Sequence, residues 1–253
     1  MEQAPGKPAQ RPEAKPLPDL REFGAPKDGE RQALDRRLYL QLHVFTQCLD
    51  PQSLVAPLKQ SGLEAVGYLD VNDPRGVGVL LVSEDAAVFT DRARHLLSRP
   101  PFAALTPRPD LTMIGRTYSL GHEPDLEDWL LRKPRRNLIL EDFPWHVWYP
   151  LRRKGEFERL SKDEQKPILM EHARLGMSYG AADLAHDIRL ACHGLDARDN
   201  EFVLGLVARQ LHTISRLIQD MRGTQQTARY MKTMGPFFVG QVFVRTVQGI
   251  LLG

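Results

Sequence analysis

Apolar residues alternate with others along LYLQLHVFTQ (38–47), at Leu38, Leu40, Leu42 and Val44, and this period of two is typical of a half-buried β-strand. Three further stretches in the first half of the chain also indicate strands, namely AVGYLDV, GVGVLLVS and LTMIGRTYSL (111–120). Patterns typical of helices separate the first strand from the second and the third from the fourth, in DPQSLVAPLKQSG and in SEDAAVFTDRARHLL before the Pro pair at 100–101. The order is therefore β-α-β-β-α-β, the arrangement of a ferredoxin-like unit.

The same order of elements repeats in the second half of the chain. A strand at HVWYPL (146–151) precedes a helix at 161–180, where Ser161 and Glu164 match a capping box and Pro167 indicates a kink or a later start. Strands at DIRLACHGLD and EFVLGLVA, a helix at LHTISRLIQDMRGTQQTARYM and a strand at GPFFVGQVFVRT complete the repeat. Each unit alone would leave one sheet face open, so we expect the two sheets to pack as a closed barrel.

The predicted fold class is α+β, with two tandem ferredoxin-like halves after an N-terminal arm. Residues 1–36 are rich in Pro and charge, which predicts a disordered or extended arm. Such an arm serves either as a clasp for another subunit or as a plain tail. The first half is expected over residues 37–125 and the second over residues 126–253.

Composition and charge narrow the classes of function. The 253 residues carry 34 basic and 32 acidic side chains, and this net charge of +2 gives no reason to expect a nucleic-acid partner. Cys48 and Cys192 lie far apart and indicate neither a disulfide framework nor a metal site. The sequence shows no secretory leader and no apolar run long enough to span a bilayer, so we expect a soluble cytoplasmic protein.

His172 is the first candidate for chemistry. On a helix it shares a face with Ile168, Leu175 and Tyr179, which places an imidazole among apolar residues. A core histidine bonded to a neighbour would give this pattern. The same pattern suits the axial ligand of a haem iron.

Tyr149 is the second candidate, because it lies in an aromatic strand between two clusters of bases. RKPRR (132–136) precedes the strand and Arg152, Arg153 and Lys154 follow Tyr149. The clusters are either solvated loops or a clamp for carboxylates, which arginine binds through two parallel hydrogen bonds. Likewise, Tyr149 is either a packed strand-end tyrosine or a redox-active phenol beside a cofactor.

Several short motifs of the second half together resemble the chlorite dismutase superfamily. They occur in the family's order, and the spacing from Tyr149 to His172 is similar to that of its actinobacterial-type members. The motifs are KPR (133–135), WYP (148–150), LMEH (169–172), GLD (194–196), MRGTQQTARY (221–230) and GPFFVGQ (235–241). Within the superfamily the chain looks most like the coproheme decarboxylases, which convert iron coproporphyrin III to haem b with hydrogen peroxide as oxidant.

The resemblance assigns roles to individual positions. His172 corresponds to the ligand of the iron, and Tyr149 to the tyrosine that forms a radical and attacks the propionates. Arg153 lies near the position of a base that assists this tyrosine. The positions expected to bind the porphyrin are Arg135, Tyr149, Arg222 and Thr227. The resemblance also implies a homopentamer with its porphyrin in the second half.

The chain departs from the family at two places. Met177 replaces a basic residue after the histidine, and the window 185–187, where a distal Gln or Arg is expected, holds Ala185, His186 and Asp187. The absence of arginine from this window speaks against chlorite chemistry, and His186 or His146 are the candidates for a distal acid–base group. The alternatives to the decarboxylase are a chlorite dismutase or peroxidase-like haem enzyme, and a non-catalytic haem-binding protein.

Overall fold

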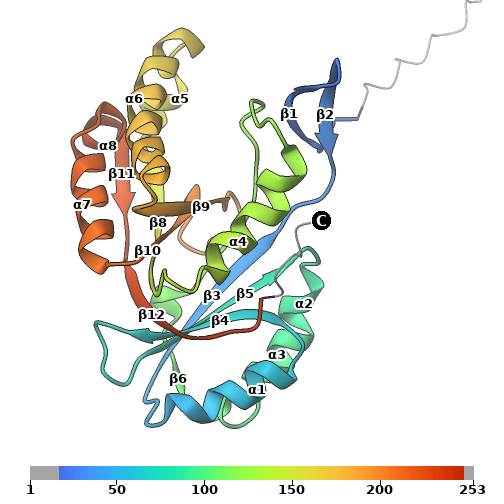
Figure 1. Ribbon diagram of the computed structural model, residues 1–253, viewed down its shortest axis with the longest axis vertical. Helices are drawn as coiled ribbons and strands as arrows, with labels where there is room; N and C mark the ends of the chain where they lie inside the picture. The colour runs from blue at the N-terminus through green and yellow to red at the C-terminus, as the bar shows by residue number, and fades with distance from the viewer. Residues whose placement is uncertain (1–16, 248–253) are drawn as a thin grey trace, which may run out of the picture.

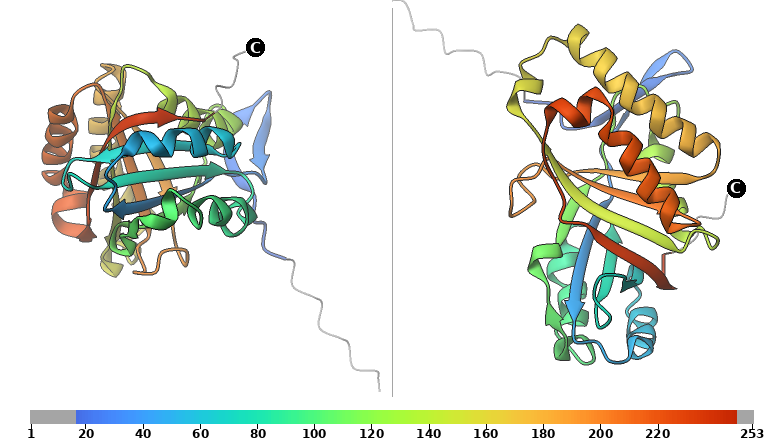
Figure 2. Two further views of the ribbon diagram at one scale, coloured as in Figure 1. Left: turned by 90° about the horizontal axis from the view of Figure 1, so that it is seen from below. Right: turned by 90° about the vertical axis from the view of Figure 1, so that its left-hand side faces the viewer.

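The strands of the two halves close into one antiparallel barrel. The computed structural model describes residues 17–247, and Figures 1 and 2 show the barrel from three sides. The first half contributes β3 (Tyr39–Thr46), β4 (Glu64–Asp70), β5 (Val77–Ser83) and β7 (Met113–Arg116), in the order β7-β3-β5-β4. The second half contributes β8 (Trp145–Arg153), β9 (Ala185–Ala191), β10 (Phe202–Ala208) and β12 (Phe238–Arg245), in the order β9-β10-β8-β12. Pairing of β12 with β4 and of β7 with β9 joins the halves, which confirms the predicted barrel.

Helices cover the outer faces of both sheets (Figure 2). In the first half these are α1 (Val55–Gln60), α2 (Ala87–Thr90) and α3 (Arg92–Leu97). In the second half they are α5 (Gly155–Glu158), α6 (Lys162–Ala181), α7 (Leu211–Arg222) and α8 (Gln225–Tyr230). The smaller elements are η1 (Pro51–Leu54), η2 (Phe102–Ala104), β6 (Thr106–Pro107), η3 (Pro109–Leu111), η4 (Asp128–Arg132), α4 (Lys133–Ile139) and β11 (Met231–Met234). Among the described residues, no helix is both long and apolar enough to cross a membrane.

Local signals explain how α6 forms. The Ser161 hydroxyl accepts a hydrogen bond from the Glu164 amide, and the Glu164 carboxylate accepts one from the Ser161 amide, so the predicted capping box is confirmed. The helix runs from Lys162 through Pro167 to Ala181, which excludes the later start. Two helices that the sequence predicted as continuous are divided, one at Asp91 and the other at Gly223 and Thr224.

Part of the predicted N-terminal arm has regular structure. Residues 1–16 lie outside the described residues, whereas β1 (Glu22–Lys27) and β2 (Glu30–Leu34) form a hairpin. Asp28 and Gly29 both have positive φ, of 54° and 86°, as a tight hairpin turn requires. The Gln32 amide donates to the carbonyl oxygens of Ala25 and Glu123, at 2.8 and 3.2 Å, which ties the hairpin to the segment that connects the two halves.

Candidate functional site

The outer face of the second sheet carries the polar side chains of the site. Register across β8, β10 and β9 aligns Tyr149 with Leu204 and Leu204 with Arg189, and the next row contains Asp187. Tyr149 packs in one apolar cluster with residues of α7, whereas its neighbour Trp148 belongs to the barrel interior. Because side chains alternate between the faces of a strand, Asp187 and Arg189 share the outer face with Tyr149.

Tyr149 is buried, yet its hydroxyl group lacks a hydrogen-bond partner among residues 17–247. The ring stacks on Phe237, with 4.6 Å between the ring centroids. Burial raises the pKa of Tyr149, the negative charge of Asp187 raises it further, and the positive charge of Arg222 opposes both. The phenol therefore keeps its proton at neutral pH and lies within electrostatic reach of an acid and a base.

His172 points from α6 toward the break between α7 and α8. Its Nδ1 atom lies 3.1 Å from Oγ1 of Thr224, whose own hydroxyl donates to the Met221 carbonyl at 2.7 Å. Burial lowers the pKa of His172, and the positive charge of Arg189 lowers it further, so the imidazole is neutral at neutral pH. A neutral imidazole carries a proton on one ring nitrogen, and the other nitrogen has a lone pair that can bind a metal.

This donor set fits a haem-type iron better than a bare metal ion. In the described part of the chain, no group of three or more His, Cys, Asp or Glu side chains could hold a metal. A macrocycle supplies four nitrogen ligands of its own and needs one axial imidazole from the protein. His172 offers such an imidazole, because its Nδ1 atom has the Thr224 hydroxyl as a hydrogen-bond partner and its Nε2 atom is left to bind the metal.

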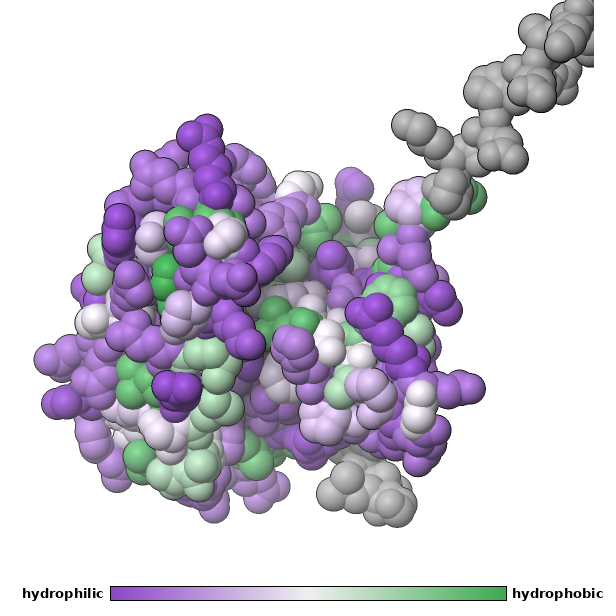
Figure 3. Space-filling view, turned by 90° about the horizontal axis from the view of Figure 1, so that it is seen from above, coloured by the Kyte–Doolittle hydropathy of each residue, from purple (hydrophilic) through white to green (hydrophobic). Residues whose placement is uncertain are grey.

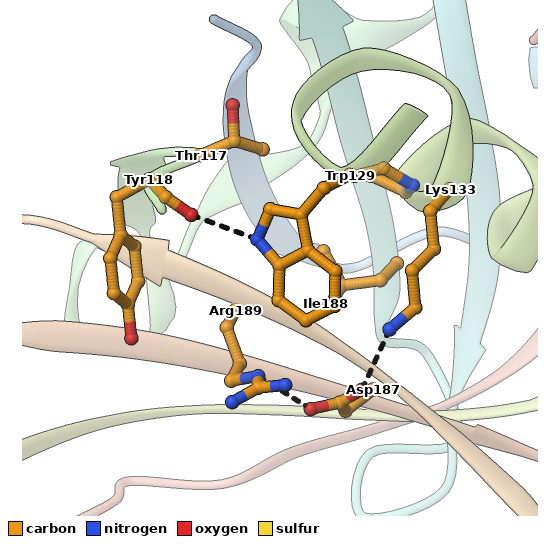
Figure 4. Close-up of a pocket in the computed structure, with 8 residues that line it drawn as sticks. Thr117, Tyr118, Trp129, Lys133, Asp187, Ile188 and Arg189 are labelled. Atoms are coloured by element: carbon orange, nitrogen blue, oxygen red, sulfur yellow. Dashed lines mark hydrogen bonds and ion pairs between the residues drawn. The ribbon is translucent and has the colours of Figure 1, made fainter. Parts of the chain in front are cut away.

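A small polar cavity lies beside this face, between η4, α4 and β9 (Figure 4). It has a volume of about 20 Å³, and Trp129, Lys133, Asp187 and Arg189 line it. Asp187 pairs with Arg189 at 2.7 Å and with Lys133 at 3.8 Å, and both bases lie against the Trp129 ring. The cavity holds about one water molecule, so a porphyrin has to use the more open face. Figure 3 shows hydrophobic residues and residues of intermediate hydropathy in the middle of the molecule's upper end, with hydrophilic residues on both sides.

The structure brings only some of the predicted residues together. Thr227 lies 3.4 Å from Thr224, the partner of His172. Arg222 is exposed and has no ion pair within the described ranges. Arg222 therefore carries a charge that no acidic side chain among the described residues matches, and this charge acts on Tyr149.

Arg153 and Arg135 have partners elsewhere. The Arg153 guanidinium pairs with Glu158 at 2.8 Å and with Glu201 at 3.4 Å. Arg135 makes two hydrogen bonds to Glu64 on β4, of 2.8 and 2.9 Å, and lies 3.6 Å from Glu84. The structure does not group Arg135 with Tyr149 and His172, and its predicted contact with a propionate remains a prediction.

Both candidates for a distal histidine lie on the wrong face of the sheet. His146 is fully buried, and its ring bonds Tyr68 and the Phe143 carbonyl. His186 alternates with Asp187 and bonds Asp183 at 2.8 Å. The polar residues on the Tyr149 side are instead Asp187 and Arg189, which sequence reasoning missed. Their alternation with Ala185 along a predicted strand was the signal available.

The comparisons with known proteins agree with the fold described above. The family model for chlorite dismutase matches residues 132–243. A novel heme-binding protein from Thermus thermophilus has a similar structure, with 18% identity and a TM-score of 0.66 over 84% of this chain and 93% of its own. A variant of the chlorite dismutase from Candidatus Nitrospira defluvii is 13% identical, with a TM-score of 0.62 over 83% of this chain and 93% of its own. A search of curated proteins by sequence finds no match. The family model and the shared fold confirm the resemblance to the chlorite dismutase superfamily.

Proposed function

Because the chain is chlorite dismutase-like, we propose that it catalyses the hydrogen-peroxide-dependent oxidative decarboxylation of coproheme III to haem b, a step of haem biosynthesis. The observation that carries the proposal is Tyr149, a buried side chain whose hydroxyl forms no hydrogen bond among residues 17–247 and which shares its sheet face with Arg189, whose charge acts on His172. A carboxylate of a bound substrate would supply the missing partner.

Nε2 of His172 would hold the iron of the substrate. When bound, this iron would supply the redox chemistry with peroxide. Tyr149 holds a proton on its phenol, because burial raises its pKa, and can give up that proton together with an electron. The resulting phenoxyl radical removes a hydrogen atom from the propionate beside it. Tyr149 thus relays oxidation to a carbon atom that the iron does not touch.

The reaction balances with one peroxide for each propionate. A propionate carboxylate loses carbon dioxide, one proton and two electrons and becomes a vinyl group. Hydrogen peroxide takes up the two electrons, this proton and one further proton from the solvent, and becomes two molecules of water. Conversion of coproheme III to haem b requires this sequence twice, by way of an intermediate with three propionates.

The remaining carboxylates need cations, since an unpaired carboxylate is costly to bury. Arg222 supports this role because it is exposed, is not ion-paired among the described residues, and lies within electrostatic reach of the Tyr149 hydroxyl. The hydroxyl of Thr227 adds a neutral donor nearby. Arg153 is paired with Glu201 and Arg135 with Glu64, so each arginine would have to release its glutamate before it could bind a carboxylate of the substrate.

The decisive experiment titrates the purified protein with ferric coproporphyrin III, adds hydrogen peroxide without oxygen, and follows the porphyrin mass. We expect stepwise loss of two carboxyl groups. Tyr149→Phe should bind the porphyrin and slow product formation by about 10³-fold or more. Tyr39→Phe, on β3 of the other half, is the control and should react normally. Binding without a change of mass in the wild type would refute the decarboxylase and leave a haem-binding protein.

One observation favours a second candidate function. Arg189 lies on the Tyr149 face, where its positive charge affects His172, and it is the arginine that the window 185–187 lacks. An arginine there suits an enzyme that acts on chlorite, an anion. Chlorite-dependent oxygen release that disappears in Arg189→Gln, together with normal turnover by Tyr149→Phe, would support this candidate over the decarboxylase.

We also propose the homopentamer that the resemblance implies. Light scattering on the purified full chain would measure the mass of the assembly. A mass of one chain would exclude it.

A further inference from the structure

Thr224 lies where α7 ends and α8 begins, but its side chain does not serve either helix in the usual way. It is the N-cap residue of α8, with extended backbone angles, and yet its hydroxyl makes no capping bond to that helix. The side chain is 5% exposed and contacts His172 instead. The loop is fixed against α6 at the neighbouring position too, because the Glu171 carboxylate accepts the Gln225 amide at 2.9 Å.

The distances decide which atom carries each proton. The Thr224 hydroxyl has one proton, and Oγ1 lies 2.7 Å from the Met221 carbonyl, a typical length for O–H···O. The 3.1 Å to Nδ1 of His172 is within the range for N–H···O. The third neighbour, Oγ1 of Thr227, is more distant at 3.4 Å. The hydroxyl therefore donates to Met221 and accepts from His172.

We propose that Thr224 is a positioning residue, which holds His172 in the tautomer with the proton on Nδ1 and thereby presents the bare Nε2 atom to the site. A histidine that binds a metal through one nitrogen is usually oriented by a hydrogen bond from the other. Here that acceptor is a hydroxyl whose own proton is directed elsewhere by the carbonyl at the end of α7. The break between α7 and α8 thus determines the chemistry of a residue on α6.

The tautomer can be measured in the protein without porphyrin, by nitrogen NMR of labelled histidines about two pH units above the ordinary histidine pKa of roughly 6.5. The His172 signals are those lost in His172→Ala. We expect Nδ1–H in the wild type and in Thr224→Ser, which keeps the acceptor. Thr224→Val removes the acceptor at the same shape and should give a mixture of the two tautomers. Thr213→Val, at the other end of α7, is the matched control and should match the wild type.

Two outcomes of this measurement would overturn the proposal. One is a wild-type His172 that carries its proton on Nε2. The other is a Thr224→Val protein that keeps the wild-type tautomer. If Thr224→Val fails to fold, the wild-type and Thr224→Ser spectra still decide between the tautomers.

A second titration tests what the tautomer does, and this part rests on the proposed function. We expect Thr224→Val to bind iron coproporphyrin about 10-fold more weakly, and to bind metal-free coproporphyrin as the wild type does. An equal loss for both porphyrins would overturn the orienting role, because it would show that only the shape of the site had changed. If His172→Ala binds iron coproporphyrin as tightly as the wild type, iron ligation fails while the NMR result stands.

Discussion

The two halves of the barrel have the same strand order, but the residues that cover their outer sheet faces differ in polarity and in how closely they pack. In the first half, α1 and α3 press an apolar layer onto the sheet that includes Phe45, Leu58 and Phe102. In the second half, the layer under α6 and α7 contains Tyr149, and α6 leaves Leu169, Met170 and Met177 exposed. The first face is therefore a packed core, whereas the second combines apolar side chains with polar groups that lack partners in the described part of the chain.

The difference shows that two halves with the same fold can still differ in the length of their helices and in the residues that cover their sheets. Strand order and closure of the barrel need only alternation and turns, and both halves supply them. The long helix α6 has 20 residues, against 6 in α1, so it extends beyond the sheet that it covers. A helix that is only partly used for packing can present His172 to a ligand.

The largest expected effect is on stability, in the first half. Phe102→Ala removes a side chain that is 1% exposed and should cost about 3–5 kcal/mol in the free energy of unfolding. Leu175→Ala removes a half-buried side chain of α6 and should cost about 1 kcal/mol. Urea unfolding of both variants measures the difference. Equal losses would mean that the face under α6 is as firmly packed as the other.

The dependence of stability on pH tests the contact between the two halves, where the His146 ring forms a hydrogen bond with the Tyr68 hydroxyl. Burial and, to a lesser extent, the positive charge of Arg245 together lower the pKa of His146 to about 3. The unfolded chain takes up a proton near pH 6.5 and the folded one does not, so this stability is present above pH 6.5 and falls as the pH drops toward 3, by about 1.4 kcal/mol per pH unit. His146→Gln should flatten the dependence of the unfolding free energy on pH between 6.5 and 4.

A residual slope is expected in His146→Gln, because burial also lowers the pKa of His43 to about 4. The double variant with His43→Gln should be flatter still. A slope that neither substitution changes would show that carboxylates dominate the acid response instead.

Much of the fold could be predicted from the sequence because its signals are local. Apolar stretches, in part alternating and bounded by turn residues, predicted the strands of both halves, and the residues of one capping box predicted the start of α6. The hairpin at 22–34 was missed although Asp28 and Gly29 form a turn signal, since the surrounding Pro and charge suggested a disordered or extended arm. The cluster RKPRR was predicted as either a solvated loop or a clamp for carboxylates, and a helix was not expected there. In the structure α4 begins at Lys133 with Pro134 in its first turn, a position that suits proline.

The candidate site was less predictable, because its electrostatics depend on contacts distant in sequence. Arg135 and Arg153 were chosen as free bases, but their charges are matched by Glu64, Glu158 and Glu201. Glu64 is 71 residues from Arg135, on a strand of the other half. No local pattern reports such a pair. The roles of Arg189 and Thr224 depend on the position of β9 beside α6 and on the break between α7 and α8, neither of which the sequence predicted.

Measuring the affinity for the porphyrin compares an arginine without an ion pair among the described residues, Arg222, with an arginine that is already paired, Arg135. Arg222→Gln should weaken binding of coproheme about 10-fold, because Arg222 has no ion pair to break within residues 17–247. Arg135→Gln should leave the affinity unchanged and cost about 1–2 kcal/mol of stability, since Glu64 loses its partner. Absorption titrations and urea unfolding separate the two effects. Weaker binding in Arg135→Gln would restore the role that the sequence predicted for it.

The smallest effect compares two buried tyrosines, one in each half. The Tyr68 hydroxyl lies 3.0 Å from Nδ1 of His146, whereas the Tyr149 hydroxyl has no partner among the described residues. Tyr68→Phe leaves a buried ring nitrogen unsatisfied and should cost about 1–3 kcal/mol. Tyr149→Phe removes a hydroxyl that contributes no bond to the folded protein, so its unfolding free energy should change by less than about 0.5 kcal/mol. A loss at Tyr149 as large as that at Tyr68 would mean that its hydroxyl already has a partner in solution, and the reason for placing a substrate carboxylate there would disappear.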